Sequence, residues 1–379
     1  MTIADGESAA LWRELRELIG RDGRVVQMIS DMAPSDASVA DTVAWQRALQ
    51  RHGIETPIYA RRLVSGHDGA AAHIDEYRHR RSDVVVLKYT LWSEVAEWVR
   101  NRRLPYGLLY YNVTPHEYFE HYDQVLARET RLGRERLPML VANCAIAAAN
   151  APFGARELLA AGFNEPSVVP ILTEPDRADT PRDPAIVEEM ARPGTNIVYT
   201  GRIAPNKRVE HTIAAFAHYQ RIDPRARLYL VGSYETRSPY FRAARRLVEQ
   251  LGLSDAIQFT GKVSRPRYLT YLAGAHVYLT MSEHEGFCVP LIESARLGVP
   301  IIARAAGAIP DTAGDAAILV DRPIPAVVAE LIDAVVSDGD LRGWLIVRGH
   351  AMAERFAYPR VEATVASFLV EATRRIRAA

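Results

Sequence analysis

The sequence predicts an α/β protein built from two doubly wound parallel-sheet domains in tandem. The chain has 379 residues, which is more than one compact core usually holds. Short β-rich runs alternate with amphipathic segments of helix length, a pattern typical of βαβ crossovers and parallel sheets. The alternation is interrupted once, at 173–193, where four prolines occur among many charged residues, as in a connection between domains.

The elements of both halves follow from the apolar periodicity and the turn residues between them. In the first half we expect strands at 24–29, 57–59, 83–87, 106–111, 144–148 and 167–172, with helices at about 39–52, 93–101 and 117–133. In the second half we expect strands at 196–200, 226–231, 257–260, 276–280, 300–303 and 317–320, with helices at 209–220, 241–251, 266–272 and 291–297. Open parallel sheets bind ligands at the carboxyl ends of their strands, so two facing domains imply a cleft between them.

Composition and charge exclude several classes of protein. Apolar residues make up 48% and charged residues 24%, the balance of a soluble globular protein. Lys+Arg and Asp+Glu both number 46, so no net positive charge points to a nucleic-acid partner. The longest apolar run, 144–149, is far below the roughly 20 residues of a membrane helix. Only two cysteines are present, and Asp5, Glu7 and Arg13 stand where a signal peptide is apolar, so we expect a cytoplasmic protein.

The most informative motif is the segment 282–294, SEHEGFCVPLIES, directly after a predicted strand. Pro290 suits the first turn of a helix and Gly298 suits its end, which puts Glu285 on the loop and Glu293 one turn inside the helix. The helix N-terminus is an anion site, and the two carboxylates can accept hydrogen bonds from hydroxyls on either side of the anion. A nucleotide sugar has this layout. Spacing alone leaves equally open that both glutamates only cap and solvate the helix start.

A second motif is the segment 199–209, YTGRIAPNKRV. A predicted strand ends before Gly201, which permits a tight turn, and Arg202 and Lys207 follow on the loop into the next helix. Two cations at the end of a strand, across from a helix N-terminus, would complete a cradle for a diphosphate. Lys207 is one of only three lysines in an arginine-rich chain, which favours a function. Considered alone, either residue would be interpreted as a solvated surface cation.

Together these segments resemble the family-4 retaining glycosyltransferases of the GT-B fold, in a bacterial polysaccharide-type branch. The family's Gly-Arg-x-x-x-x-Lys element corresponds to Gly201, Arg202 and Lys207, and its Glu-x7-Glu element runs from Glu285 to Glu293. Further similar stretches are the donor-side turn GAIP at 307–310 and the first-domain stretches YNVTP at 111–115 and DEY at 75–77. The resemblance implies domains at 1–180 on the acceptor side and 181–355 on the donor side, with a helix at 356–379 crossing back onto the first.

The resemblance also implies a reaction and its residues. A retaining hexosyltransferase would use a nucleotide-diphosphate sugar, GDP-mannose or a UDP-sugar, with no metal and no cofactor. Arg202 and Lys207 would hold the diphosphate and neutralise the leaving group, and Glu285 would accept hydrogen bonds from the sugar. Other donor contacts would come from Gly201, Gly286, Phe287, Val289, Leu291 and, at the ribose, Glu293. The acceptor is open between a glycan, a lipid-linked molecule and a small molecule.

The first domain departs from the family's pattern. The loop 30–41 contains no glycine, where relatives usually have a glycine-bearing loop. Lys88 and Tyr111 stand where relatives carry histidines, and His116 is a candidate substitute, although a lone histidine is more often a surface residue. With Asn112, these residues are the candidate contacts from the first domain. The donor half is therefore predicted to be intact and the acceptor half to be remodelled.

A non-catalytic protein and a different enzyme on the same fold are the two alternative classes for the whole chain. A non-catalytic scaffold that binds a sugar nucleotide would fit the altered first domain. A sugar-nucleotide epimerase would need further catalytic acids, and a glycosyl phosphorylase would need a second phosphate cradle.

The segment 92–103 is predicted to be an ordinary surface helix in preference to a membrane-facing patch. Asp338 and Asp340 are predicted to belong to a turn that caps a late helix, and not to a metal site.

Overall fold

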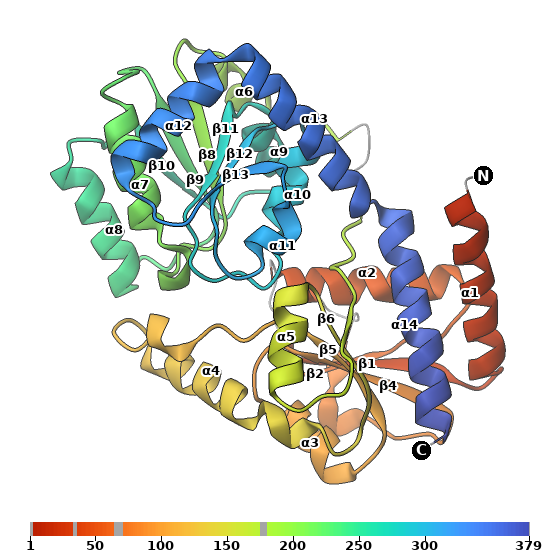
Figure 1. Cartoon of the computed structure of the whole chain (residues 1–379). Helices are drawn as coiled ribbons and strands as arrows, with labels where there is room; N and C mark the ends of the chain where they lie inside the picture. The colour runs from red at the N-terminus through yellow and green to blue at the C-terminus, as the bar shows by residue number, and fades with distance from the viewer. Residues whose placement is uncertain (1–2, 33–35, 64–70, 175–179, 379) are drawn as a thin grey trace. The chain divides into compact units, whose positions relative to one another are not determined.

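The computed structural model describes residues 3–32, 36–63, 71–174 and 180–378. The chain divides into two compact units, each built around a parallel sheet (Figure 1). The first unit comprises Met1–Glu117, Val125–Pro175 and Phe356–Ala379, and the second comprises Tyr118–Gln124 and Asp176–Arg355. The C-terminal segment therefore belongs to the unit formed by the first half of the chain.

The first unit contains a seven-stranded parallel sheet with the order β3-β2-β1-β4-β5-β6-β7. The order reverses between β1 and β4, as in doubly wound folds. The strands are β1 Arg24–Met32, β2 Ile58–Leu63, β3 Ala72–His73, β4 Asp83–Tyr89, β5 Tyr106–Tyr110, β6 Cys144–Ala149 and β7 Ser167–Val168. The helices are α1 Ile3–Ile19, α2 Ala37–Arg51, α3 Glu94–Arg102, α4 Gln124–Arg136, α5 Pro152–Ala160 and α14 Tyr358–Ala378, and short 3-10 turns lie at Ile74–Glu76, His116–Tyr118 and Leu137–Leu140.

The last helix, α14, packs beside α1 on this unit (Figure 1). Trp12 of α1 and Trp45 of α2 are buried in the same apolar cluster as Val365 and Phe368 of α14. The Trp45 and Phe368 rings meet edge to face, with centroids 6.1 Å apart. Each such fully buried apolar side chain contributes about 1.5–3 kcal/mol to folding, so α14 is an integral part of the first unit's core.

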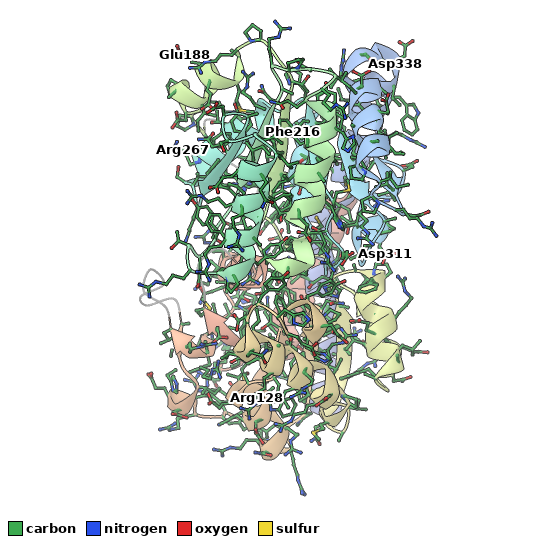
Figure 2. The ribbon with its side chains drawn as sticks, turned by 90° about the vertical axis from the view of Figure 1, so that its left-hand side faces the viewer. Arg128, Glu188, Phe216, Arg267, Asp311 and Asp338 are labelled. Carbon is green, nitrogen blue, oxygen red and sulfur yellow. The ribbon has the colours of Figure 1, made fainter. Side chains whose placement is uncertain are left out.

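The second unit contains a six-stranded parallel sheet with the order β10-β9-β8-β11-β12-β13. Phe216 is buried in its core, whereas Glu188, Arg267 and Asp338 are exposed at its surface (Figure 2). The strands are β8 Asn196–Thr200, β9 Arg227–Val231, β10 Ile257–Gly261, β11 Val277–Thr280, β12 Ile301–Arg304 and β13 Ala317–Val320. The helices are α6 Pro184–Met190, α7 Val209–Tyr219, α8 Pro239–Gln250, α9 Arg265–Ala273, α10 Val289–Arg296, α11 Ile309–Ala313, α12 Pro325–Ser337 and α13 Gly339–Arg355, with a 3-10 turn η4 at Pro205–Lys207.

The two parallel sheets confirm the predicted fold class, and the differences in single elements have local causes. The strand predicted at 167–172 ends at Val168, because Pro170 has no N–H to donate to the ladder. The helix predicted at 117–133 begins only at Gln124, since the amides of Tyr122 and Asp123 donate to the Phe119 carbonyl and close a turn first. The predicted connection at 173–193 contains helix α6.

Two smaller predictions concern the surface. The Asp338 carboxylate accepts hydrogen bonds from the amides of Asp340 and Leu341, so this turn caps α13. Trp98 of α3 packs edge to face on Tyr77 at 5.1 Å between ring centroids and carries the Arg102 guanidinium over its ring, as in an ordinary surface helix. Among the described residues, no helix is long and apolar enough to cross a membrane.

Candidate functional site

The candidate site lies at the carboxyl ends of β8 and β11 in the second unit. The two strands are adjacent and parallel, with Ile197 opposite Val277, so the loops that follow them leave the same edge of the sheet. The loop after β8 carries the segment 201–207, and the loop after β11 carries the segment 281–288. Both motifs singled out in the sequence therefore meet at the edge where open parallel sheets bind ligands.

Lys207 and Glu285, one from each loop, form an ion pair. The Lys207 Nζ donates to the Glu285 Oε2 at 2.6 Å, and the two side chains are only 20% and 13% exposed. Lys207 is the last residue of the 3-10 turn η4, which begins at Pro205. Its amide donates to the Ala204 carbonyl at 2.9 Å, and this hydrogen bond fixes the backbone from which the lysine side chain extends. The predicted cation and the predicted carboxylate are thus each other's partner.

Further contacts hold the two loops together. The Asn206 Nδ2 donates to the His284 carbonyl at 3.2 Å, and the Glu283 amide donates to the Asn206 carbonyl at 2.9 Å. The Glu283 carboxylate accepts hydrogen bonds from both Arg208 and Arg304. Burial would raise the pKa of Glu283, but the hydrogen bonds from the two guanidiniums outweigh it and hold that pKa below its ordinary value. These contacts fix the two loops against each other.

Gly201 lies where the ends of β8 and β9 approach most closely. Its amide donates to the Val231 carbonyl at 2.9 Å, and a Cβ on Gly232 would lie 1.9 Å from the Gly201 oxygen. Both glycines have positive φ angles, +148° and +156°, so neither position accepts a larger residue without a shift of the backbone. Arg202 follows with an exposed side chain, and no hydrogen bond or ion pair engages its guanidinium among the described residues.

Glu293 of α10 is buried and already paired. Its carboxylate lies 2.6 Å from the Arg265 Nη1 and also accepts a hydrogen bond from the Tyr268 hydroxyl. Burial, together with the nearby carboxylate, raises the pKa of Tyr268 well above its ordinary value, so this hydroxyl stays a donor. No side chain in the described part of the chain caps the start of α10, so neither Glu285 nor Glu293 is the simple helix cap that spacing had left open.

The start of α10 departs from one expectation. Cys288, with a φ of +71°, is the residue before the helix, and its carbonyl accepts a hydrogen bond from the Leu291 amide at 3.1 Å. The Leu291 amide is thereby occupied, and the predicted contact of this amide with a phosphate is not supported by its position. Val289 remains at the helix N-terminus beside half-buried Gly286 and buried Phe287. Burial raises the pKa of the Cys288 thiol, consistent with a small filling residue.

The turn at 307–310 supports the backbone of Glu285. The Ala308 amide donates to the Glu285 carbonyl at 2.9 Å. Gly307 has a φ of +57°, and a Cβ there would lie 2.7 Å from the same carbonyl oxygen. A glycine is therefore required at this turn, which the sequence had placed on the donor side.

In the first unit, Lys88 is closed off from solvent. Its Nζ donates to the Asp41 Oδ2 at 3.0 Å and lies 4.0 Å from the centre of the Trp45 ring, with both charged side chains 0% exposed. Burial lowers the pKa of Lys88 to about 8 against the opposing effect of Asp41. The Tyr111 hydroxyl donates to the same carboxylate. The expectation that Lys88 contacts a ligand is wrong, because the lysine is a buried partner of Asp41.

Asn112 is held by residues that the sequence analysis did not single out. Its Nδ2 donates to the Glu157 Oε2 at 2.7 Å, and Glu157 also accepts from the Tyr110 hydroxyl and the Arg134 Nη2, both at 2.9 Å. Arg134 also donates to the Val113 carbonyl at 2.7 Å. Asn112 has a φ of +69°, and its buried Oδ1 has no hydrogen-bond partner among the residues that the structure describes. This network fixes the turn after β5 and leaves one amide oxygen to accept a hydrogen bond.

His116 lies beside its neighbour in the sequence. Its Nδ1 lies 3.4 Å from the carboxylate of the adjacent Glu117, and its side chain is 27% exposed. The candidate residues of the first unit therefore separate into a buried group around Asp41, a network around Glu157, and a histidine beside its neighbour.

The second unit matches a known protein family. Residues 188–351 match the family model of the glycosyl transferases group 1. The similarity to this family therefore covers most of the second unit. The matched segment contains all the residues predicted to hold a donor, from Gly201 to Glu293.

Curated relatives match parts of the chain. An MMP alpha-(1->4)-mannosyltransferase of Mycolicibacterium hassiacum is 34% identical over 110 residues, 29% of this chain and 26% of the relative. A D-inositol 3-phosphate glycosyltransferase of Xylanimonas cellulosilytica is 25% identical over 207 residues, 54% of this chain and 49% of the relative. The chain thus spans half or less of the length of these two relatives.

Solved structures match nearly the whole chain. HepE of Anabaena, in complex with UDP and glucose, has a TM-score of 0.66 and 15% identity, covering 91% of this chain and 98% of that one. A sucrose-phosphate synthase of Thermosynechococcus elongatus has a TM-score of 0.68 and 15% identity, also covering 91% of this chain and 98% of that one. At this identity the likeness concerns the fold alone, and it confirms the predicted GT-B fold.

Proposed function

We propose that this protein is a glycosyltransferase that moves a sugar from a nucleotide-diphosphate donor, GDP-mannose or a UDP-sugar, to a glycan, a lipid-linked molecule or a small molecule. The match to the glycosyl transferases group 1 supports the reaction class. Relatives named as mannosyltransferases support the first donor, and the structure of HepE with UDP-glucose supports the second. The cytoplasmic location predicted from the sequence is part of the proposal.

The observation that carries the proposal is the Lys207–Glu285 ion pair, with the exposed Arg202 on the same loop as Lys207. Without a donor, the Lys207 ammonium is held by Glu285. A bound diphosphate would compete for that ammonium and would draw in the Arg202 guanidinium, because charge-assisted bonds to phosphate are among the strongest in proteins. Release of the lysine would free the Glu285 carboxylate to accept hydrogen bonds from the hydroxyls of the transferred sugar.

The proposed mechanism retains the anomeric configuration. The acceptor hydroxyl attacks the anomeric carbon on the face that the diphosphate leaves, and the leaving phosphate takes the hydroxyl proton. The protein then stabilises the charge on the leaving group with Arg202 and Lys207 and positions the reactants, and supplies no strong nucleophile. The proposal involves no metal ion and no cofactor.

A non-catalytic scaffold that binds a sugar nucleotide is the second candidate. It is favoured by the state of Lys88 and Tyr111, which stand where the resemblance led us to expect histidines. Both side chains are bound to Asp41 inside the first unit. The scaffold would keep the donor cradle of the second unit and lack turnover.

The test uses the purified protein with GDP-mannose and with UDP-, dTDP- and ADP-glucose, each separately, and measures binding by calorimetry and nucleotide release. Saturable binding of one donor with release, both lost in Arg202→Ala and kept in Arg242→Ala, would support the transferase. Arg242 is a matched control because it is exposed on α8. Binding without release across a panel of acceptors would favour the scaffold. Absence of binding to any of the donors would contradict both.

A further inference from the structure

The first unit has a cavity of about 500 Å³ away from the carboxyl ends of its strands. Its walls come from the end of α1, the turn that leads into β1, and the turn between α2 and β2. These turns precede β1 and β2, so the cavity lies at the amino ends of the two strands. Ligands of open parallel sheets bind at the opposite edge, so this cavity is distinct from any substrate site of the GT-B kind.

Three arginines line the cavity. Arg13, Arg16 and Arg21 are exposed, and none of their guanidiniums has a hydrogen bond or an ion pair within the described part of the chain. The nearby Arg24 differs from these three arginines, because its guanidinium donates a hydrogen bond to Asp83 at 2.7 Å. Three unengaged guanidiniums around one cavity repel each other, and an anion bound among them would remove that repulsion.

Two carboxylates among the lining residues, Glu17 and Glu55, offset part of this charge but leave the lining net positive. Glu55 lies 3.6 Å from both Arg24 and Arg80, which do not line the cavity, so its charge is already shared. Glu17 is the other lining carboxylate. The dipole of α1 does not account for the presence of all three arginines either. Of the lining arginines only Arg16 lies in the last turn of α1, where a cation is stabilised.

The cavity is preformed. The Trp12 ring of α1 stacks on the His52 ring at the end of α2, with centroids 4.5 Å apart, and thereby holds two of its walls together. Gly53 has a φ of +70°, and a Cβ there would lie 3.4 Å from the Arg16 Nη1. The Arg16 guanidinium therefore lies against a bare stretch of backbone, and a Cβ at this position would be in ordinary van der Waals contact with it. A site of this volume, with fixed walls, suits a small molecule.

We propose that this cavity binds a small phosphate-bearing molecule, whose phosphate oxygens accept hydrogen bonds from Arg13, Arg16 and Arg21. Guanidinium groups pair with phosphate oxygens through two parallel hydrogen bonds, so three of them match the several oxygens of a phosphate better than the two of a carboxylate. A phospholipid headgroup offers the same chemistry, but binding to a membrane surface usually adds apolar anchors. None of the large apolar side chains exposed among the described residues lines this cavity. A soluble phosphate ester is therefore favoured, whether or not the protein is a glycosyltransferase.

The test titrates the full chain with inorganic phosphate and with glycerol 3-phosphate, followed by calorimetry. A parallel arm measures sedimentation with vesicles of phosphatidylcholine and phosphatidylglycerol. We expect saturable binding of a soluble phosphate that weakens about tenfold, or about 1.4 kcal/mol, in Arg16→Gln and in Arg21→Gln. Arg242→Gln, on the exposed face of α8, is the control and should bind as the parent chain does. Thermal melts check that each variant is folded, and Arg21, on an exposed turn outside the helix, provides the variant least able to disturb the fold.

The donor cradle could also bind phosphate, so every titration is repeated in an Arg202→Ala background. Binding that persists there and is lost with Arg16 and Arg21 places the site in this cavity. Saturable binding that disappears only with Arg202, binding that is equal in all variants, or no saturable binding would overturn the proposal. Binding to vesicles without binding of soluble phosphate would overturn it as well.

Discussion

The Lys207 ammonium donates to the Glu285 carboxylate at 2.6 Å, although the two residues are 78 positions apart in the sequence. Both side chains are mostly buried, so neither charge is fully solvated when its partner is removed. The pair therefore couples the order of the two strand-end loops to the site at which we propose the donor binds. This coupling gives single and paired substitutions different expected outcomes.

Lys207→Ala should lower the free energy of unfolding by about 1–3 kcal/mol, because it leaves a mostly buried carboxylate without its partner. It should also abolish donor binding in calorimetry. Lys262→Ala is a matched control, since Lys262 is an exposed lysine of the same unit and should change neither quantity. If the double variant Lys207→Ala, Glu285→Gln is no more stable than Lys207→Ala alone, the two side chains do not interact as described.

Glu285→Gln should keep the fold and lower turnover about 100-fold, with a smaller effect on binding of the free nucleotide diphosphate. The amide keeps one oxygen but loses the charge that we propose acts on the sugar hydroxyls. Steady-state kinetics with the donor found in the binding screen, beside calorimetry with its nucleotide, measures both quantities. Equal losses for the nucleotide and the nucleotide sugar would contradict a role at the sugar.

Gly232→Ala should destabilise the protein by about 3 kcal/mol or more, because a Cβ there meets the Gly201 carbonyl oxygen at 1.9 Å. Gly252→Ala is the comparison. Gly252 also has a positive φ, +70°, but a Cβ there meets nothing within 4 Å, so only the backbone penalty of about 1 kcal/mol applies. Urea denaturation of both variants gives the difference. Equal losses would show that the close approach of the two strand ends does not occur.

Stability should depend on pH through Lys88. Its pKa in the folded protein is about 8, below its ordinary value of 10.5, because burial disfavours the charged form more than Asp41 favours it. Between these two values the unfolded chain binds more protons than the folded one, so the free energy of unfolding rises with pH across this window. Across this whole pH window, Lys88 alone raises the free energy of unfolding by about 3 kcal/mol.

The measurement compares the parent chain with a Lys88→Met, Asp41→Asn variant by urea denaturation at pH 7.5 to 10, a range chosen to span roughly this window. The difference in unfolding free energy between the two should grow in favour of the parent chain as pH increases. Tyr111 donates to Asp41 in both proteins, or to the amide that replaces it, so its effect is largely shared. A pH-independent difference would mean that Lys88 keeps its ordinary pKa in the folded state.

Glu157→Gln should loosen the turn after β5, because Gln cannot accept all three hydrogen bonds now made by Tyr110, Asn112 and Arg134. If the protein is a glycosyltransferase, turnover should fall about 10- to 100-fold while donor affinity stays within about twofold, since the donor cradle is in the other unit. Glu135→Gln, at an exposed position of α4, is the control. A large loss of donor affinity would contradict a role confined to the turn.

Several features of the site could be predicted from the sequence because they depend on neighbours along the chain. A strand followed by glycine and two cations predicts the loop after β8, and proline with a later glycine brackets helix α10. Gly232 carried the same local signal as Gly201, a glycine directly after a strand, and could have been noticed. Lys88 carried a different signal. It continues the apolar run of a central parallel strand, where both faces are buried and a charge needs a partner.

The partners themselves were beyond the sequence. Asp41 lies 47 positions from Lys88, and Glu157 lies 45 positions from Asn112. Several acidic residues of the first half could have met either side chain, and composition and spacing do not distinguish among them. The helix predicted at 117–133 failed for a related reason, because its first turn is replaced by hydrogen bonds to Phe119 that local propensity does not reveal.

The sequence by itself determined the class of fold, the two sheets, and the loops that carry Arg202, Lys207, Glu285 and Glu293. These features follow from periodicity and turn chemistry, which act over a few residues. Only the tertiary structure decided that Lys207 is paired with Glu285, that Glu293 is paired with Arg265, and that Lys88 is buried on Asp41. Such pairings depend on which strand ends the sheet order brings side by side, and that order is set by the packing of the whole unit.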